Sequence, residues 1–504
     1  MKYYFLGIGG IGMSALARYF KQRGDDVWGY DRTPSPLTKE LEKEGISIHY
    51  ADNPVEIPAD IDLAIYTPAI PEDTLEFQAL KASGVRMEKR SQMLGELTRD
   101  KKCIAVAGSH GKTTTTAMIA HLLNASKQGC SAFLGGISKN FHSNLLVNND
   151  SEWMVVEADE YDRSFFQLHP YYSVITATDP DHLDIYGNHK NLIEAFEQFA
   201  NQTDPAGRIF LKEGVGFLDE SNETIGHGKH FTGKFMVVGK DIQELQGDTT
   251  HTESARSLTN HCQHDHGEAL HGLKLAEGLS AQTYSADSLV SDYYAINVRS
   301  HRGNIFFDLR TPQGVYYDLQ LVNSSFFNVE NAVAACAVAF SVGLSEYEVR
   351  AALKSFKGVV RRFDYHINEP SIVYIDDYAH HPQEISAAIA SARLLYKDKR
   401  IVGVFQPHLY SRTADLYKEF AEALSPLDEI VLMDIYPARE KPIPGVTSRL
   451  ILNEIHSMNR YIVDRKDVPS VVVALCPDVV ITMGAGDIDR LVPDIEKALR
   501  ENME

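Results

Sequence analysis

Cysteine is scarce in this chain, which holds five in 504 residues, widely spaced and without a CxxC pair. An odd, scattered set of this kind argues against a disulfide framework and fits the reducing cytosol. Apolar runs of membrane-spanning length are also missing, and the first residues form a strand pattern instead of the basic and apolar segments of a signal peptide. These absences predict a cytoplasmic protein with no membrane partner.

Positive charge is in short supply as well. Lysine and arginine number 49 against 69 acidic residues, which gives a formal net charge of −20. Such an acidic chain has no broad footprint for nucleic acid, so an anionic ligand must be held by individual lysines, arginines and helix starts. The length predicts about three domains, and a hydrophobic content of 44% supports large cores. These totals do not decide between a monomer and a dimer.

One segment stands out against this background: residues 104–116, with the sequence IAVAGSHGKTTTT. An apolar strand, Ile104–Ala107, runs into a loop bounded by two glycines, and Lys112 then opens a helix. Such a loop turns backbone N–H groups toward phosphate, its lysine reaches the outer phosphates and the following Thr hydroxyl can ligate Mg²⁺. We predict that this loop binds ATP or another nucleoside triphosphate, although Val106 stands where the strict pattern has glycine. The residues expected to line the site are Gly108, Ser109, His110, Gly111, Lys112, Thr113 and Thr114.

Alternating strand and helix patterns divide the chain into three α/β units. Residues 1–98 have the doubly wound pattern of a Rossmann-like domain, residues 99–357 that of a central P-loop ATPase-type domain, and residues 358–504 a second Rossmann-like pattern. The expected strands include Tyr3–Leu6, Val27–Tyr30, Leu63–Tyr66, Met154–Glu157, Val174–Ala177, Ile372–Ile375, Ile401–Phe405, Ile430–Met433 and Val479–Met483. The expected helices include 112–124, 189–200 and 328–342, and Ser355–Gly358 is expected to be a linker.

A second glycine-rich turn follows the first strand and includes Gly7, Gly9, Gly10 and Gly12. These glycines allow a diphosphate to approach a helix start, and Asp31 at the end of the second strand can accept a ribose or base hydrogen bond. The pattern does not choose between NAD and another nucleotide diphosphate. A turn that only packs a helix on a strand is the alternative.

Two acidic motifs could hold a metal ion. Glu157–Glu160 follows an apolar strand, and a carboxylate there, beside a phosphate loop, suits Mg²⁺. His182 follows Asp181 after a later strand. A histidine is an unusual Mg²⁺ ligand, so a structural or capping role is the alternative for His182.

The C-terminal unit carries further polar residues after its strands. Arg361 and Arg362 could clamp a γ-phosphate, and the acidic pair before Tyr378 could hold ribose or orient a base. His380 and His381 could position an amine, and Arg412 could capture a carboxylate. The alternative is an ordinary loop before a helix that begins at Pro382.

Histidines are concentrated between residues 227 and 271, where seven of the twenty occur. Metal binding is one interpretation. We favour an exposed insertion, because no second ligand cluster with regular spacing accompanies these histidines.

The order of these motifs resembles the Mur ligase family over nearly the whole chain. The resemblance implies three domains that bind a UDP-sugar, ATP and an amino acid in succession, with Mg²⁺ as cofactor. Within the family the chain is most similar to the branch that joins L-alanine to the carboxylate of UDP-N-acetylmuramate in peptidoglycan precursor synthesis. The implied roles are phosphate binding by Lys112, Mg²⁺ binding by Thr113, Glu157 and His182, ATP contacts by Asn328, Asn331 and Asp377, γ-phosphate binding by Arg362, and an alanine pocket of Tyr378, His381 and Arg412. Lys112, His182, Arg362 and His381 would be the catalytic set, and Gly7, Gly9, Gly10, Gly12 and Asp31 would bind the UDP-sugar.

The chain departs from the family pattern at three positions. Phe327 replaces the usual histidine before the first asparagine, Ala177 replaces an asparagine, and Leu409 replaces an arginine. Sister ligases carry a carbamylated lysine, for which we assign no residue. Two rivals remain. One is the ligase that recycles a tripeptide onto the same UDP-sugar, and the other is an NAD-dependent dehydrogenase built on the Gly7–Gly12 turn, which leaves the Gly108–Thr113 loop unexplained.

Overall fold

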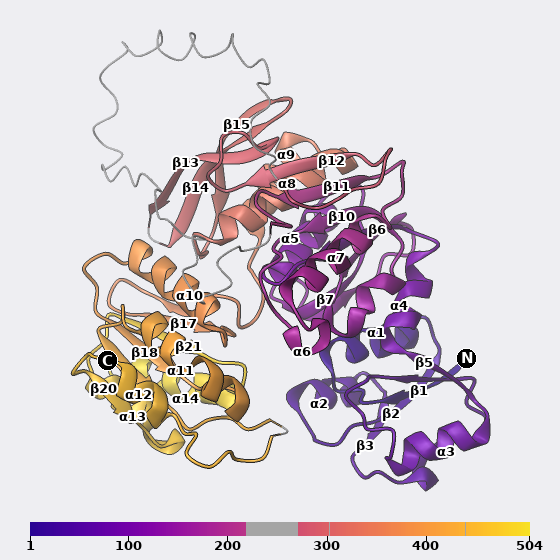
Figure 1. Cartoon of the computed structure of the whole chain (residues 1–504), viewed down its shortest axis with the longest axis horizontal. Helices are drawn as coiled ribbons and strands as arrows, with labels where there is room; N and C mark the ends of the chain where they lie inside the picture. The colour runs from indigo at the N-terminus through magenta and orange to yellow at the C-terminus, as the bar shows by residue number, and fades with distance from the viewer. Residues whose placement is uncertain (218–270, 302, 439, 504) are drawn as a thin grey trace.

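The computed structural model describes residues 1–217, 271–301, 303–438 and 440–503, which form three α/β units. Each unit is built around its own sheet (Figure 1). The middle unit lies above the other two in that view, with the N-terminal unit at lower right and the C-terminal unit at lower left. This three-unit α/β architecture confirms the predicted fold class.

The N-terminal unit holds a five-stranded, fully parallel sheet with the order β3-β2-β1-β4-β5. Its strands are β1 (Lys2–Leu6), β2 (Asp26–Tyr30), β3 (Ser47–His49), β4 (Leu63–Tyr66) and β5 (Arg86–Lys89). Its helices are α1 (Ile11–Gln22), α2 (Pro36–Lys43), α3 (Leu75–Ser83) and α4 (Arg90–Thr98). Ligands of such sheets bind beyond the carboxyl ends of the strands, where the glycine turn after β1 lies.

The middle unit holds a ten-stranded mixed sheet with the order β15-β14-β13-β12-β11-β10-β6-β9-β7-β8. Its strands are β6 (Lys102–Ala107), β7 (Ser131–Ser138), β8 (Ser143–Leu146), β9 (Trp153–Glu157), β10 (Pro170–Ile175), β11 (Arg208–Lys212), β12 (Ala281–Ser285), β13 (Tyr293–His301), β14 (Asn304–Thr311) and β15 (Gly314–Leu321). Its α-helices are α5 (Lys112–Asn124), α6 (Leu183–Tyr186), α7 (His189–Ala200), α8 (Asn328–Val342) and α9 (Glu346–Ser355). The central strands β6, β9 and β10 are parallel, so their carboxyl ends share one edge.

The C-terminal unit holds a six-stranded sheet with the order β16-β17-β21-β18-β19-β20, parallel except for β16. Its strands are β16 (Asp364–Asn368), β17 (Val373–Asp377), β18 (Ile401–Phe405), β19 (Glu429–Leu432), β20 (Arg460–Ile462) and β21 (Val479–Met483). Its α-helices are α10 (Pro382–Leu395), α11 (Tyr410–Leu424), α12 (Arg449–Glu454), α13 (Val468–Ala474) and α14 (Val492–Glu501).

One apolar core runs from the N-terminal unit into the middle unit. Buried side chains of α1, such as Leu16 and Phe20, belong to the same cluster as Phe133 of β7 and Val156 of β9. Two further clusters contain only C-terminal residues among their buried members. The first two units therefore share a core, whereas the third has its own.

The strand and helix predictions are confirmed in most places. The helices expected at 112–124, 189–200 and 328–342 have those bounds. Several strands begin or end a few residues from the predicted bounds. At the carboxyl ends that border the site, β10 ends at Ile175 instead of Ala177, and β17 extends through Asp377 instead of ending at Ile375. Thr176 and Ala177 leave the strand because the phosphate loop binds them: Ser109 N–H donates to the Ala177 carbonyl at 3.1 Å.

The predicted linker and the histidine-rich segment have different outcomes. Ser355 is the last residue of α9 and not the start of a linker. The histidine-rich segment 227–271 lies outside the described residues except for its last residue, so the two interpretations of it stay open.

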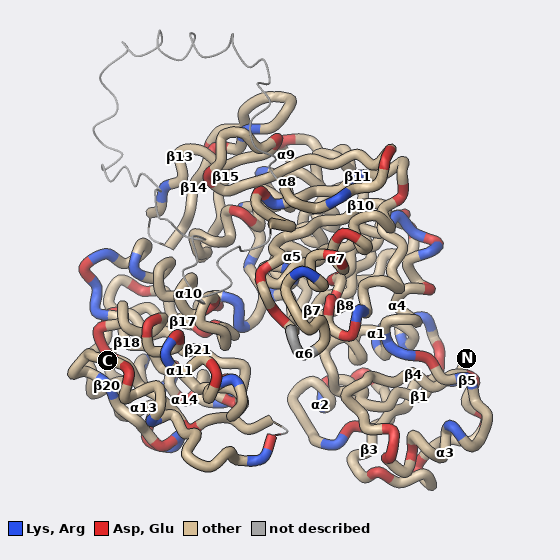
Figure 2. The backbone as a smooth tube through the Cα atoms, viewed as in Figure 1, with Lys and Arg blue, Asp and Glu red and all other residues tan. Residues whose placement is uncertain are grey.

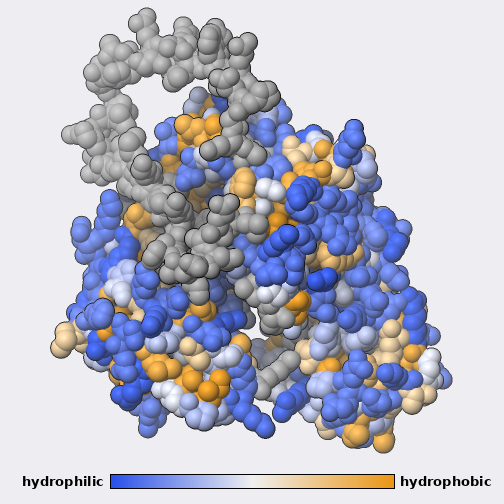
Figure 3. All heavy atoms as spheres, viewed as in Figure 1, coloured by the Kyte–Doolittle hydropathy of each residue, from blue (hydrophilic) through white to orange (hydrophobic). Residues whose placement is uncertain are grey.

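Charged residues occur in all three units. Figure 2 shows acidic and basic residues distributed over the whole molecule instead of one basic patch. The face in Figure 3 is mostly hydrophilic, with small apolar patches. Among the described helices, none combines the length and the apolarity that a bilayer crossing requires.

Candidate active site

The phosphate loop lies between β6 and α5, at the carboxyl edge of the middle sheet. Gly108 has φ +138°, and a Cβ there would lie 2.2 Å from Thr176 Oγ1. Gly111 has φ +81° and ends the loop as the residue before α5. Both positions require glycine, because an L side chain rarely adopts such angles. The loop backbone is therefore fixed in a curve that opens α5 toward the sheet edge.

Lys112 stands at the start of α5 and is held by two oxygen atoms. Its Nζ donates to the Gly108 carbonyl at 2.5 Å and to Glu160 Oε1 at 2.7 Å. Burial opposes the ammonium charge, but Glu160 and Glu157 outweigh it and raise the lysine pKa. Lys112 is therefore a cation at neutral pH, placed where the outer phosphates of a nucleotide would lie.

The loop after β9 contributes two carboxylates to this edge. Glu157 Oε2 accepts from Gly135 N–H at 3.2 Å, and the nearby Thr113 hydroxyl stabilises the charged form of the carboxylate. Burial raises the pKa of Glu157, although Lys112 and Thr113 act against the shift. The predicted pair Thr113 and Glu157 is thus brought together beside Lys112.

His182 lies in a second group of donors, with Asp181 and Glu160. Its Nε2 is 3.6 Å from Asp181 Oδ2 and 3.8 Å from Glu160 Oε1, and the three ligand atoms all lie within 4.8 Å of one another. Among the described residues, Glu160 Oε2 is buried and without a hydrogen-bond partner. Oxygen donors of this kind suit Mg²⁺, so the residues fit such an ion. Sequence reasoning missed Glu160 as a contact of Lys112, although the residue stands in the motif it quoted.

The two asparagines at the start of α8 pack against α5. Thr115 Oγ1 donates to Asn331 Oδ1 at 3.0 Å, and Asn331 Nδ2 donates to Asn328 Oδ1 at 2.9 Å. Phe327 stands edge-on to Phe363, with ring centroids 5.9 Å apart. The pair therefore reaches the phosphate-loop helix, and Phe327 contacts the C-terminal unit instead of offering a hydrogen bond.

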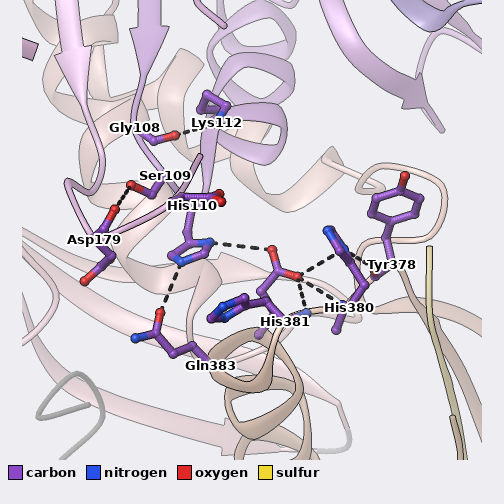
Figure 4. Close-up of polar contacts among 12 residues, drawn as sticks. Gly108, Ser109, His110, Lys112, Asp179, Tyr378, His380, His381 and Gln383 are labelled. Atoms are coloured by element: carbon purple, nitrogen blue, oxygen red, sulfur yellow. Dashed lines mark hydrogen bonds and ion pairs between the residues drawn. The ribbon is translucent and has the colours of Figure 1, made fainter. Parts of the chain in front are cut away.

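His110 joins the phosphate loop to the C-terminal unit, as Figure 4 shows. Its Nδ1 lies 3.5 Å from Glu384 Oε1 and its Nε2 lies 3.3 Å from Gln383 Oε1, both in the first turn of α10. Burial alone would lower the His110 pKa, but Glu384 raises it. The contact places the start of α10 next to the phosphate loop.

The paired arginines have different surroundings. Arg361 is tied into the C-terminal unit by Asp376 at 3.4 Å and by the Gly484 carbonyl. Both guanidiniums lie over the Tyr378 ring, with Cζ 5.0 Å from its centroid for Arg361 and 5.1 Å for Arg362. The charge of Arg362 also acts on Glu157 of the middle unit, where it opposes the rise in pKa caused by burial. Arg362 is therefore the arginine placed toward the phosphate loop.

Asp377 accepts two backbone hydrogen bonds, from Phe363 N–H at 2.8 Å and from Ala379 N–H at 2.7 Å. Burial raises its pKa to about 7, against the opposing charge of Arg362. This carboxylate organises the turn that carries Tyr378, and its ribose contact stays a prediction.

Three histidines and one arginine gather beyond β17 and β18. Burial lowers the pKa of His380 and His381, and lowers that of His408 to about 4. The imidazoles are therefore neutral at neutral pH, while Arg412 stays charged. Among the described residues, Arg412 Nη1 and His381 Nδ1 are buried and without a hydrogen-bond partner. A cation beside neutral bases matches a zwitterionic amino acid, whose carboxylate needs the cation and whose ammonium needs acceptors.

Leu409 has φ +72°, an angle that few non-glycine residues adopt, and precedes α11. Its N–H donates to the Tyr436 carbonyl at 2.9 Å, while the His408 ring stacks on Tyr436 with centroids 5.8 Å apart. The strained turn directs α11, with Arg412 in its first turn, toward the histidines.

In the N-terminal unit, the glycine turn after β1 closes against β2. Gly7 has φ +86°, and Gly9 N–H donates to Asp31 Oδ2 at 2.8 Å. Gly10 precedes α1 without a side-chain cap, and Gly12 lies in its first turn. The five predicted residues are thus adjacent, with Asp31 bound to the turn itself.

The candidate residues lie at the carboxyl edges of the three sheets, an arrangement typical of a three-domain, ATP-dependent ligase. The chain belongs to the Mur ligase family. Models described as the Mur ligase family catalytic domain, the Mur ligase middle domain and the Mur ligase glutamate ligase domain match residues 2–102, 106–261 and 361–486. This membership removes the dehydrogenase reading.

Similar proteins are known in sequence and in structure. The chain is 44% identical to a UDP-N-acetylmuramate–L-alanine ligase of Phocaeicola vulgatus over 499 residues, covering 98% of this chain and 96% of that protein. It is also 44% identical to the ligase of that name from Porphyromonas gingivalis, covering 99% and 98%. The crystal structure of UDP-N-acetylmuramate-alanine ligase MurC from Thermotoga maritima aligns with a TM-score of 0.75 at 28% identity, over 99% of both chains.

Proposed function

We propose that this chain joins L-alanine to the carboxylate of UDP-N-acetylmuramate with ATP, in peptidoglycan precursor synthesis. The proposal is supported by the contact of His110 with Gln383 and Glu384 of α10, which brings the phosphate loop against the C-terminal unit. The relatives that bear the name of this ligase support the same conclusion. Because ATP and UDP-linked sugars are cytoplasmic metabolites, we place the reaction in the cytoplasm.

A carboxylate and an ammonium group do not condense at neutral pH, so the carboxylate must be activated. The muramoyl carboxylate attacks the γ-phosphorus of ATP, ADP leaves, and an acyl phosphate forms. The free amine of alanine then attacks the acyl carbon and expels phosphate. The products are ADP, phosphate and the amide, and the ammonium proton goes to a base.

The residues take the following roles in this proposal. Lys112 and Arg362 stabilise the charge on the transferred phosphoryl group. Arg412 binds the alanine carboxylate, and His381, whose burial lowers its pKa, accepts the ammonium proton. Thr113 and Glu157 would form one set of Mg²⁺ ligands, and His182 with Asp181 and Glu160 would form a second set. Bound Mg²⁺ would supply positive charge to the phosphates.

Phosphate release tests the proposal. Purified protein is incubated with ATP, Mg²⁺ and UDP-N-acetylmuramate, and L-alanine, glycine, L-serine or the tripeptide L-Ala-D-Glu-diaminopimelate is added in turn. We expect release with L-alanine and not with the tripeptide. Phosphate release with the tripeptide but with none of the amino acids would instead assign the chain to the recycling ligase.

A further inference from the structure

The glycine turn of the N-terminal unit holds little positive charge of its own. Gly9 N–H is already bonded to Asp31, and α1 begins at Ile11 without a basic residue in its first turn. A diphosphate carries at least two negative charges, and the chain as a whole has a net charge of −20. A cation from elsewhere in the fold is therefore needed at this turn.

Arg90 supplies that cation. It is the first residue of α4, and its side chain lies against the first turn of α1. A Cβ on Gly12 would lie 2.7 Å from Arg90 Nη1 and 3.0 Å from Arg90 Cδ. The absence of a side chain at Gly12 thus makes room for the guanidinium. This contact explains why glycine stands at position 12, which the backbone conformation alone does not explain.

The other side of the same guanidinium faces the middle unit. Arg90 Nη2 donates to Asp159 Oδ2 at 3.1 Å, and the arginine side chain is 21% exposed. A small cavity beside it is lined by Arg90, Glu157 and Asp159, among others. Arg90 therefore stands between the glycine turn of the first unit and the carboxylate loop that approaches Lys112.

We propose that Arg90 binds the diphosphate of the sugar nucleotide and that Asp159 orients its guanidinium for this contact. The inference rests on the proposed function, which supplies a UDP-linked substrate. A guanidinium offers five N–H donors in a planar fork, so one edge can be held by a carboxylate while another receives phosphate oxygens. The substrate's diphosphate would then be fixed relative to both the glycine turn and the carboxylate loop.

Lys89 provides a matched control one residue earlier in the chain. Its Nζ lies 3.1 Å from Asp162 Oδ2, so it forms a pair of the same length from the same segment to the same loop. The Lys89 side chain is 40% exposed. The three atoms nearest to a Cβ on Gly12 all belong to Arg90 and none to Lys89. Lys89 thus bridges the two units, whereas the atoms nearest to Gly12 are those of Arg90.

The experiment measures binding of UDP and of uridine to the full-length protein by titration calorimetry, without ATP or alanine. Arg90→Gln should weaken UDP binding about 10- to 100-fold, the range expected for a charge-assisted contact. It should leave uridine binding unchanged, because uridine has no phosphate. Lys89→Gln should leave both affinities unchanged.

Asp159→Asn separates a ligand contact from a structural brace. If Arg90 only braces the two units, Asp159→Asn and Arg90→Gln lower UDP affinity equally, which would overturn the inference. If Arg90 binds the diphosphate and Asp159 orients it, Asp159→Asn keeps the arginine charge and lowers UDP affinity several-fold less than Arg90→Gln does. Equal loss of uridine and UDP binding in Arg90→Gln would also overturn it.

The controls keep this inference distinct from the proposed function. Wild-type protein that binds no UDP would contradict the proposed function itself. Wild-type binding of UDP that Arg90→Gln leaves intact would contradict only the role of Arg90.

Discussion

The two glycine loops of this chain share a backbone design and differ in their charges. Each follows a parallel strand, turns at a glycine with positive φ, and opens a helix at the carboxyl edge of its sheet. The loop before α5 carries its own cation, Lys112, and its own counter-ion, Glu160. The loop before α1 carries neither, and the neighbouring cation comes from Arg90 of α4.

This difference shows what a glycine loop does and does not specify. The glycines give an anion room to approach the backbone, but the side chains around them decide which anion binds and what happens to it. A reacting γ-phosphoryl group needs a fixed cation in the loop. A diphosphate that only anchors its substrate can use a cation from a neighbouring helix.

Removing Lys112, the cation of the glycine loop before α5, should have the largest effect. Lys112→Ala is expected to lower kcat by about 1,000-fold or more, because the phosphoryl group loses its stabilising charge. Phosphate release measures this, with Lys190→Ala, an exposed lysine on α7, as the control. Wild-type kcat in the Lys112 variant would contradict the difference between the loops.

The same variant leaves the buried Glu160 carboxylate without its cation. We therefore expect Lys112→Ala to lower the melting temperature, and the added change Glu160→Gln to restore part of it without restoring activity. Recovery of activity in the double variant would contradict the role given to Lys112.

Adding a methyl group to each loop tests their backbone similarity. Gly108→Ala places Cβ 2.2 Å from Thr176 Oγ1 at φ +138°, and should cost about 2 kcal/mol, or a melting temperature lower by about 4–8 °C. Gly10→Ala has φ −66° and no atom nearer than 3.6 Å, so its melting temperature should stay within about 2 °C of wild type. Calorimetric melting separates the two outcomes, and equal shifts would refute the strain assigned to Gly108.

At the edge of the third sheet, no glycine loop precedes α11. Binding of alanine there should therefore depend on a side chain. Arg412→Ala is expected to raise the KM for L-alanine about 10- to 100-fold, because the carboxylate loses its charged partner, and to leave the KM for ATP near wild type. Steady-state kinetics with each substrate varied checks this. Lys418→Ala, which removes an exposed cation from the same helix, is the control. A rise confined to the KM for ATP would remove Arg412 from the alanine pocket.

The smallest effect concerns the pH dependence of stability at that third edge. Burial raises the pKa of Asp377 to about 7, so the folded protein holds this proton more tightly than the unfolded chain. Stability from this group is fully present below about pH 4 and is lost as the pH rises through about 7, with a slope of at most about 1.4 kcal/mol per pH unit. Asp377→Asn should flatten that slope.

Denaturant titrations of wild type and Asp377→Asn between pH 5 and pH 8 measure this slope. Asp415→Asn, an exposed carboxyl on α11, is the charge control. Parallel curves for wild type and Asp377→Asn would show that the Asp377 carboxyl does not titrate in this range.

The sequence predicted the helices and strands whose bounds are set by nearby residues. The glycine and lysine spacing placed the start of α5 at Lys112, and its bounds match. The end of β10 was predicted two residues late, because Thr176 and Ala177 are apolar or β-branched but bind the phosphate loop. That contact joins segments about 70 residues apart and leaves no local signal.

The candidate site shows the same limit. The motif Glu157–Glu160 was recognised, but only the fold places Glu160 on Lys112 and Asp159 on Arg90. The loop then continues into a turn at Asp162 and Arg163, which have φ of 52° and 54°. Composition and spacing carry no information on a left-handed turn formed by non-glycine residues.

The shared core of the first two units has a consequence for modularity. Because Leu16 of α1 and Val156 of β9 belong to one buried cluster, the N-terminal unit cannot be excised without exposing the apolar face of the middle sheet. The C-terminal unit buries its own clusters. A chimaera that exchanges the chain after Val360, and so keeps Val359 in the middle-unit core, should therefore fold, whereas one cut near residue 98 should aggregate. Recombination within the family would be free to vary the amino-acid site while the other two sites stay coupled.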